Sequence, residues 1–200
     1  YLRKPTGDLV ARVRITKLGR SLTMADVEIH RQGEAEMVAH ALRPRIGAVG
    51  ARLIYASGLV QHAGVILGVG GFAGHAHRFA HPGDWGYLGR LQAQQHYAAV
   101  TAACLMTRRA VFDELKGLEE ELPVDFNDVD FCLRVRAAGY RIVFTPFAEL
   151  IHHESASFGR RTQSAAELAL MRHRWGAALE RDPYYNPNLS KLFSDYRLQV

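Results

Sequence analysis

The sequence predicts an α/β fold, in which a mixed sheet with flanking helices follows a short antiparallel β-meander. Three observations lead to this prediction. Residues 8–41 alternate between apolar and polar positions, as half-buried strands do. Residues 42–200 contain short apolar runs with strand character, and segments 128–138 and 163–179 have helical periodicity. Because the pattern changes at Arg43-Pro44-Arg45, we expect two units, residues 1–41 and residues 42–200.

The first unit is expected to consist of three strands joined by short turns. Residues 8–16, 22–30 and 36–41 alternate in polarity, and Gly19 and Gly33 lie in the turns between them. A meander of three strands buries little surface by itself, so we expect another element to cover its apolar face.

The second unit is expected to mix strands, loops and helices. In the helix predicted at 128–138, apolar residues recur at helical spacing, Asn127 or Asp128 can cap the start, and Gly139 stands where helices commonly end. Pro146 is expected to end the strand before it. The other expected elements are strands at 48–55, 98–107 and 141–145, a Gly/His-rich loop at 68–89, helices at 109–115 and 163–179, and an irregular tail at 182–189.

Composition limits the classes of function. The formal net charge is +5, but the basic residues are scattered and are not interleaved with aromatic residues, which argues against a nucleic-acid partner. No stretch approaches the roughly 18–20 apolar residues of a transmembrane helix. We therefore expect a cytoplasmic protein, and peripheral contact with the inner face of the membrane through Arg172, Arg174 and Trp175 is an open alternative. Cys104 and Cys132 lack metal-site spacing and are expected to be buried free thiols.

The strongest chemical signal is Asn127-Asp128-Val129-Asp130, which opens a predicted helix, followed after the next strand by His152-His153. In an α/β sheet this order can bring a carboxylate base and a metal-binding imidazole to one rim. Asp128 can accept a proton as a hydroxyl attacks, although an acid at this place can also be a simple helix cap. Asp130 either touches substrate or complements the helix dipole. Arg134, four residues further on, is expected to form an ion pair with Asp130.

Five stretches carry a family resemblance: RPRIGAVG (43–50), QHAGV (61–65), TAACL within 98–109, FNDVDFCLR (126–134) with GYR (139–141), and ELIHHESAS (149–157). In this order they resemble the C-terminal, acceptor-side part of the family-two inverting glycosyltransferases of bacterial surface-polysaccharide synthesis, over about residues 43–160. The resemblance implies a partial GT-A-like domain. It also implies transfer of a hexosyl or deoxyhexosyl unit from a nucleotide-sugar donor to a saccharide or lipid-linked acceptor, as in O-antigen synthesis.

The resemblance also implies roles for single residues. Asp128 would be the base that deprotonates the acceptor hydroxyl. His152, with His153 in reserve, would bind a divalent metal, Mn²⁺ or Mg²⁺. The residues expected to contact substrate are Asp130, Arg134, Trp85 and His62. Trp85 can stack on a sugar ring, although packing under its loop is at least as common; His62 shares an acceptor-side loop with His75 and His77, for which metal binding is the weaker interpretation.

In that family an N-terminal half supplies the nucleotide-binding strands and an Asp-x-Asp motif, and residues 1–41 have no Asp-x-Asp. They instead resemble a fragment of a hotdog-fold acyl-CoA thioesterase, through ARV (11–13), KLGR (17–20), ADVEI (25–29) and MVA (37–39). We therefore expect a truncated or rearranged glycosyltransferase, with loss of activity left open. The two alternatives are a hotdog thioesterase with a foreign extension and a non-catalytic saccharide-binding module.

Overall fold

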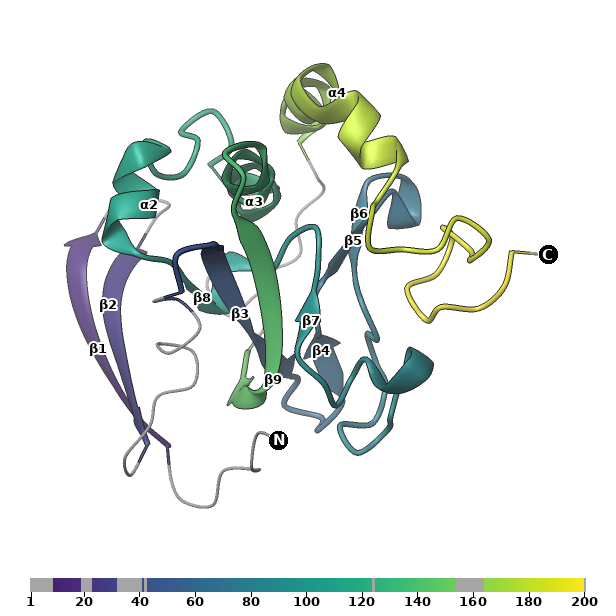
Figure 1. Ribbon diagram of the computed structural model, residues 1–200, viewed down its shortest axis with the longest axis horizontal. Helices are drawn as coiled ribbons and strands as arrows, with labels where there is room; N and C mark the ends of the chain where they lie inside the picture. The colour runs from purple at the N-terminus through teal and green to yellow at the C-terminus, as the bar shows by residue number, and fades with distance from the viewer. Residues whose placement is uncertain are drawn as a thin grey trace.

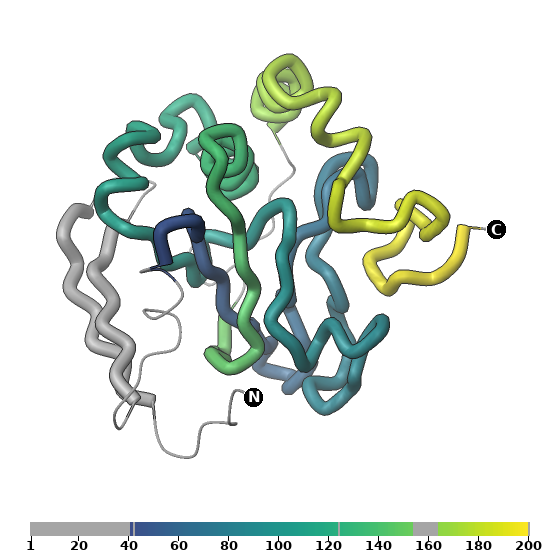
Figure 2. Tube along the Cα trace, in the orientation of Figure 1, coloured from purple at the N-terminus to yellow at the C-terminus, as the bar shows by residue number. Residues whose placement is uncertain are grey.

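A mixed β-sheet forms the centre of the protein, and helices pack along it (Figures 1 and 2). The computed structural model describes residues 41, 43–123, 125–153 and 164–199, together with the backbone of residues 9–18 and 23–31. The sheet has the order β4–β3–β9–β7, and β8 also pairs with β3. Its strands are β3 (Ile46–Ile54), β4 (Val60–His62), β7 (Gln95–His96), β8 (Leu105–Met106) and β9 (Arg141–Ile151). The predicted α/β class with a mixed sheet and flanking helices is confirmed.

The predicted helices form close to their expected positions: α2 (Arg109–Glu114), α3 (Asn127–Ala137) and α4 (Ala165–Glu180). Two predictions for the connecting segments were too simple. The loop expected at 68–89 contains the short 3₁₀ turns η1 (Val69–Gly71) and η2 (Tyr87–Gly89), as well as β6 (Ala73–His75), which pairs with β5 (Val65–Leu67). The strand expected at 98–107 is interrupted by η3 (Ala102–Cys104), because the Thr101 side chain accepts a hydrogen bond from the Ala103 amide and turns the chain.

Strand β9 continues through Pro146, so the prediction that this proline ends the strand is wrong. β9 runs parallel to β3, and residues 141–145 pair with 46–51 before the register shifts and 149–151 pair with 52–54. The residues between the two paired segments form a bulge, so the missing N–H of Pro146 costs no ladder hydrogen bond. Pairing beyond the bulge carries β9 to the same end of the sheet as the end of β3.

Buried side chains form a cluster on each face of the sheet. The larger cluster joins the sheet to the helices and includes Ala48, Ile142, Phe144, Val111, Val129 and Met171. The smaller cluster takes intervening positions of the same strands, including Val49, Ala51, Leu53 and Val143. Helix α3 packs very close to β3 at Gly47, where an added Cβ would lie 2.3 Å from Cγ1 of Val135.

Helix α3 begins after a residue with left-handed backbone, without a side-chain cap. Phe126 is the N-cap residue, has a φ of 62° and makes no side-chain capping bond, so the prediction that Asn127 or Asp128 caps the helix is wrong. This conformation costs a non-glycine residue roughly 1–2 kcal/mol, and the ring of Phe126 packs 4.3 Å from that of Phe72, between centroids. Gly139, with a φ of 88°, follows the helix end as predicted.

Helix α4 is tied to the segment before α3 by its own N-terminal cap. The Ser164 hydroxyl accepts a hydrogen bond from the Glu167 amide (3.4 Å), and the Glu167 carboxylate accepts one from the Asp125 amide (2.8 Å). The Asp125 carboxylate in turn accepts a hydrogen bond from the Ser164 amide (3.4 Å). These bonds satisfy orphan amides at the start of α4 and fix it against the approach to α3.

The two cysteines are free, as predicted. Cys132 is buried in α3, where burial raises its thiol pKa to about 12. Cys104 is only half-buried, so the prediction of burial holds for Cys132 and less fully for Cys104.

Near the N-terminus, β1 (Leu9–Leu18) and β2 (Thr23–Arg31) form an antiparallel hairpin, which confirms the first two predicted strands. The third, at 36–41, falls outside the described residues except for Ala41, which is helical. The division into units 1–41 and 42–200 stays a prediction. Across the described part of the chain, no helix is both long enough and apolar enough to cross a membrane.

Candidate functional site

Asp128 lies in the first turn of α3, and two backbone amides hold its carboxylate. Oδ1 accepts a hydrogen bond from the N–H of Val129 (2.8 Å), and Oδ2 accepts one from the N–H of Ala102 (3.0 Å). The side chain is half-buried, so it can meet a ligand. A carboxylate offers about four acceptor positions, and the two amides use two of them. Asp128 is therefore oriented and can still accept a further hydrogen bond from a hydroxyl.

His62 is fully buried at the end of β4, and its two ring nitrogens have distinct partners. Nε2 accepts hydrogen bonds from the amides of Gly64 (3.3 Å) and Thr101 (3.4 Å), and Nδ1 lies 3.0 Å from Nδ1 of His75. Because Nε2 accepts, the proton of the neutral ring sits on Nδ1 and is donated to His75. Burial, followed by the nearby charges of His75 and His152, lowers the pKa of His62 well below its ordinary value, which keeps the ring neutral.

The structure brings His62 and Asp128 together at one loop. His62 holds the amide of Thr101, and Asp128 holds the amide of the next residue, Ala102. The loop before η3 is thus held by a histidine of β4 and an acid of α3, elements more than sixty residues apart in sequence.

His152 follows the last residue of β9 and is held by Gln61. Its Nδ1 lies 2.8 Å from Oε1 of Gln61, and its backbone N–H donates to the carbonyl of Ile54 (2.9 Å). Because Nδ1 donates to the amide oxygen, the lone pair of the neutral ring lies on Nε2. Metal-binding histidines are commonly oriented in this way by an outer hydrogen-bond partner. His153, the next residue, is exposed.

The side chains that could bind a metal allow a limited test of the metal prediction. Among the residues that the structure describes, no group of three or more His, Cys, Asp or Glu side chains could hold a metal ion. His152 fits the role of a single imidazole ligand, which Mn²⁺ accepts more readily than Mg²⁺ does. The described residues therefore fit one ligand of a metal site and do not form a complete one.

Asp130 is wholly buried, and both of its carboxylate oxygens are bound within the protein. Oδ2 accepts from Nε of Arg134 (2.7 Å), which confirms the predicted i,i+4 ion pair. Oδ1 accepts from Nη1 of Arg174 (3.1 Å) and from the indole N–H of Trp175 (2.8 Å). Arg134 also donates to the carbonyls of Leu115 and Gly117. In this conformation these groups join α3 to α4, and substrate contact by Asp130 or Arg134 stays a prediction.

The same network bears on the expected contact with a membrane. Arg174 binds Glu119 (2.7 Å) as well as Asp130, and Trp175 is partly buried. Of the three residues proposed for that contact, these two are engaged within the protein and Arg172 is exposed.

Trp85 lies before η2 and is 74% exposed, so its ring is not packed under the loop. Its neighbour Tyr87 does pack, with its ring stacked 5.0 Å from that of Tyr196. Sugar stacking by Trp85 remains a prediction.

Sequence reasoning missed three parts of this site: Gln61, the pairing of His75 with His62, and the amides of Thr101 and Ala102. Gln61 was visible only as a polar residue in the QHAGV stretch, and His75 was considered only as a weak metal-site candidate with His62 and His77. The amides leave no sequence signal, since every residue except proline carries one.

Comparison with known proteins gives relatives over most of this chain. It is 51% identical over 172 residues to the uncharacterized protein y4gI of Sinorhizobium fredii, a match that covers 82% of this chain and 19% of the relative. It is 40% identical over 169 residues to the O-antigen biosynthesis protein RfbC of Myxococcus xanthus, covering 82% of this chain and 13% of the relative. A shorter match is to the N-acetylglucosaminyl-diphospho-decaprenol L-rhamnosyltransferase of Mycobacterium tuberculosis. The two chains are 36% identical over 61 residues, which cover 30% of this chain and 20% of the relative.

The chain thus spans a fifth or less of the length of these curated relatives. A continuous match over 82% of the chain must include its central part, with His62, Asp128 and His152. The names of the relatives point to a glycosyltransferase-like family. No protein-family model matches the chain. None of these names is that of a thioesterase, and the hotdog resemblance of residues 1–41 stays a prediction.

Proposed function

We propose that this chain carries the acceptor side of an inverting glycosyltransferase site that acts in O-antigen or cell-wall polysaccharide synthesis. The observation that carries the proposal is the carboxylate of Asp128, which is half-buried, oriented by two amides and able to accept a further hydrogen bond. The names of the Myxococcus and Mycobacterium relatives support the same class of reaction.

In this proposal Asp128 is the general base. The acceptor hydroxyl donates its hydrogen bond to the carboxylate, and its oxygen attacks the anomeric carbon of the nucleotide sugar. The bond from that carbon to the donor diphosphate breaks, the nucleoside diphosphate leaves with the electron pair, and the hydroxyl proton passes to Asp128. Attack from the face opposite the leaving group inverts the anomeric centre. The two amides keep the carboxylate in one orientation throughout, which lowers the entropic cost of reaching the reactive geometry.

The other predicted residues have supporting roles in this proposal. His62 holds the loop that gives Asp128 its Ala102 contact, and so acts as a positioning residue. His152 would supply one ligand to a divalent metal, which would neutralise charge on the donor diphosphate. Exposed Trp85 would offer its ring to an acceptor sugar. Asp130 and Arg134 would act mainly by fixing α3, which carries the base.

A transfer assay tests the proposal. The full chain, with Mn²⁺ or Mg²⁺, is incubated with a panel of nucleotide sugars that includes an L-rhamnose donor, together with saccharide and lipid-linked acceptors. We expect at least one donor to give a glycosylated product and free nucleoside diphosphate in equal amounts. Saccharide binding without transfer for any donor would contradict the proposal and identify a binding module. Saturable hydrolysis of an acyl-CoA would instead favour the thioesterase alternative.

A further inference from the structure

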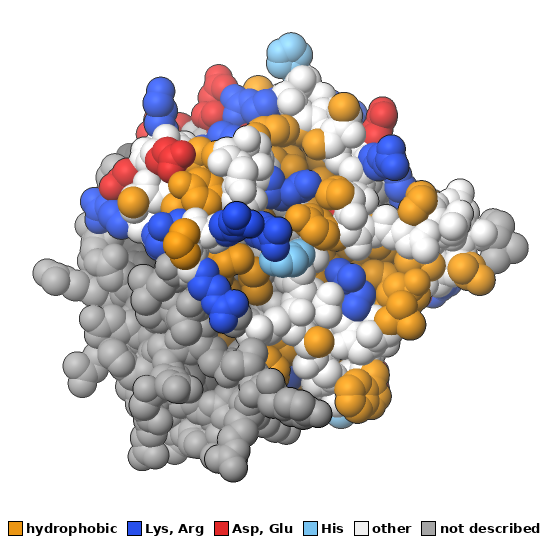
Figure 3. All heavy atoms as spheres, viewed as in Figure 1, with side chains coloured by type: hydrophobic (Ala, Val, Ile, Leu, Met, Phe, Trp, Pro, Cys, Tyr) orange, Lys and Arg blue, Asp and Glu red, His pale blue; other side chains and the backbone are white. Residues whose placement is uncertain are grey.

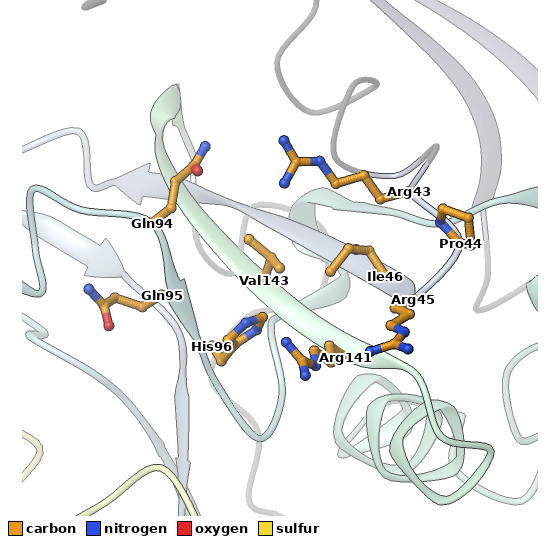
Figure 4. A pocket seen from close by; sticks show the side chains of 9 residues that line it. All are labelled: Arg43, Pro44, Arg45, Ile46, Gln94, Gln95, His96, Arg141 and Val143. Atoms are coloured by element: carbon orange, nitrogen blue, oxygen red, sulfur yellow. The ribbon is translucent and has the colours of Figure 1, made fainter. Parts of the chain in front are cut away.

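A cavity of about 600 Å³ has a lining rich in arginine. Arg43, Arg45 and Arg141 contribute to it, together with His96 and Gln94. Figure 4 shows the guanidinium group of Arg43 extending toward Gln94 and that of Arg141 extending toward His96. On the surface, Lys and Arg side chains and a histidine gather near the middle of one face (Figure 3).

Part of the cavity lining is apolar. Ile46 and Val143 line it, and both belong to the smaller buried cluster of the sheet. The ring of His96 is fixed beside them, because its Nδ1 lies 3.1 Å from the carbonyl of Ile142. The backbone N–H of Arg141 donates to the carbonyl of Arg45 (2.8 Å), which joins two of the arginines through the main chain. The polar groups are therefore placed by paired strands.

The cavity is separate from the candidate site around Asp128. Ile46 and Arg141 are the first paired residues of the parallel strands β3 and β9. His152 follows the opposite, carboxyl end of β9. A ligand in this cavity would therefore lie at the far end of these strands from His152.

Among the described residues that line the cavity, the charged side chains are arginines and none is acidic. Within the part of the chain that the structure describes, no ion pair involves Arg43, Arg45 or Arg141, whereas Arg52 pairs with Glu149 (2.6 Å) and Arg134 with Asp130 (2.7 Å). Three guanidinium groups around one hollow repel one another, and a bound anion would relieve this repulsion.

We propose that this cavity binds a phosphate-bearing ligand, in which a diphosphate group would meet the guanidinium groups. Guanidinium groups offer planar pairs of N–H donors that bind phosphate oxygens in a bidentate way. A cavity of this volume is larger than one phosphate requires and lies within the range of small-molecule sites. The phosphate comes either from a free molecule or from the headgroup of a lipid. This inference does not depend on the proposed transfer reaction.

Calorimetric titration of the full chain with pyrophosphate at low ionic strength tests the proposal. The double variant Arg45→Gln with Arg141→Gln removes two charges from the cavity. The control Arg181→Gln removes a charge from an exposed position at the end of α4. We expect saturable binding by the wild type, a loss of affinity of about tenfold or more in the double variant, and a change of no more than about twofold in the control. Binding should also weaken as salt is added.

A second arm distinguishes the source of the phosphate. Vesicles of phosphatidylcholine with about one third phosphatidylglycerol are compared with vesicles of phosphatidylcholine alone. Binding to the anionic vesicles only, lost in the double variant, would assign the cavity to a lipid headgroup, and binding of pyrophosphate would assign it to a free phosphate compound. If neither probe binds, or if the double variant and Arg181→Gln weaken binding equally, the proposal is wrong.

Discussion

At the scale of single residues, α3 carries two acids with different environments. Asp128 is half-buried, and in the described part of the chain its hydrogen bonds come from two amides. Asp130 has no exposed surface and is bound by two arginines and a tryptophan. The two acids are two positions apart on a helix, so their side chains point in directions about 200° apart. One can therefore meet a ligand while the other fixes the helix.

The buried carboxylate gives the first stability prediction. Asp130→Asn removes the charge that Arg134 and Arg174 share, and we expect a loss of about 3 kcal/mol in the free energy of unfolding. The matched control is Asp113→Asn, which breaks the exposed i,i+4 pair with Arg109 and should cost less than about 0.5 kcal/mol. Urea denaturation followed by circular dichroism measures both. Equal losses in the two variants would show that the network around Asp130 contributes little.

Single residues differ in how well the sequence predicts their surroundings. The Asp130–Arg134 pair follows from helical spacing alone, because residues four apart are neighbours on a helix. Contact between His62, His75 and the Thr101 amide could not be predicted, since it depends on how β4, β6 and the loop before η3 pack. The exposure of Trp85 could not be predicted either, because an aromatic residue in a loop can pack against the protein or face the solvent.

At the scale of secondary-structure elements, periodicity predicted the ends of the helices within one or two residues. It failed where contacts with other elements decide how a strand or helix begins or ends. The Pro146 prediction shows why: proline blocks a ladder bond, but a bulge lets the strand pass it, and only pairing with β3 reveals the bulge. The start of α3 is a similar case. Asn and Asp are favoured caps, yet the chain enters α3 through the left-handed backbone of Phe126, whose ring packs on Phe72.

Close packing between α3 and β3 can be tested by substituting Gly47, which lies at this contact, and by comparing it with Gly176 in α4. Gly47→Ala places a Cβ 2.3 Å from Val135 and 2.7 Å from Cβ of Tyr140, so the helix must shift, and we expect a loss of roughly 1–3 kcal/mol in stability. Gly176→Ala lies inside α4 in open space and should stabilise the protein by about 0.5–1 kcal/mol. Thermal unfolding separates the two, since the melting temperatures should move in opposite directions. A neutral Gly47→Ala would show that α3 packs less closely than described.

At the scale of the whole molecule, two buried histidines make stability depend on pH. Burial lowers the pKa of His62 well below its ordinary value, and burial followed by the charge of Arg90 lowers the pKa of His77 to about 4. In both cases the folded-state pKa lies below the value of the unfolded chain, about 6.5. As the pH falls below that value, the unfolded chain binds protons that the folded protein does not. Stability contributed by these neutral rings is therefore present at neutral pH and is lost on acidification.

We expect His77 to account for about 2–3 kcal/mol of lost stability between about pH 7.5 and pH 4.5. The variant His77→Asn removes the titrating group and keeps a residue that tolerates the positive φ of 56° at this position. Urea unfolding across this range should show a shallower dependence on pH for His77→Asn than for the wild type. Parallel curves would mean that His77 is not kept neutral by the fold.

The sequence-based account of the whole molecule is confirmed at a coarse level. The α/β class with its mixed sheet follows from patterning, and the relatives point to a glycosyltransferase-like family. The arginine-lined cavity was not predicted, because Arg43, Arg141 and His96 belong to three segments that only the pairing of β3, β9 and β7 brings together. The spacing of residues in a sequence predicts which residues are neighbours within one helix or strand. It does not predict which separate elements pack together.

The role of Asp128 as the base is tested most directly by its isosteric variant. Asp128→Asn removes the proton acceptor and keeps an oxygen for one of the two amides. Initial rates of sugar transfer and donor affinity are measured for the wild type, Asp128→Asn and the control Asp113→Asn. We predict a loss of about 10²-fold or more in transfer rate for Asp128→Asn, with donor affinity and the control's rate unchanged. The unfolding midpoint should fall only slightly, because one amide loses its acceptor. Transfer by Asp128→Asn within about twofold of the wild type would contradict the assignment.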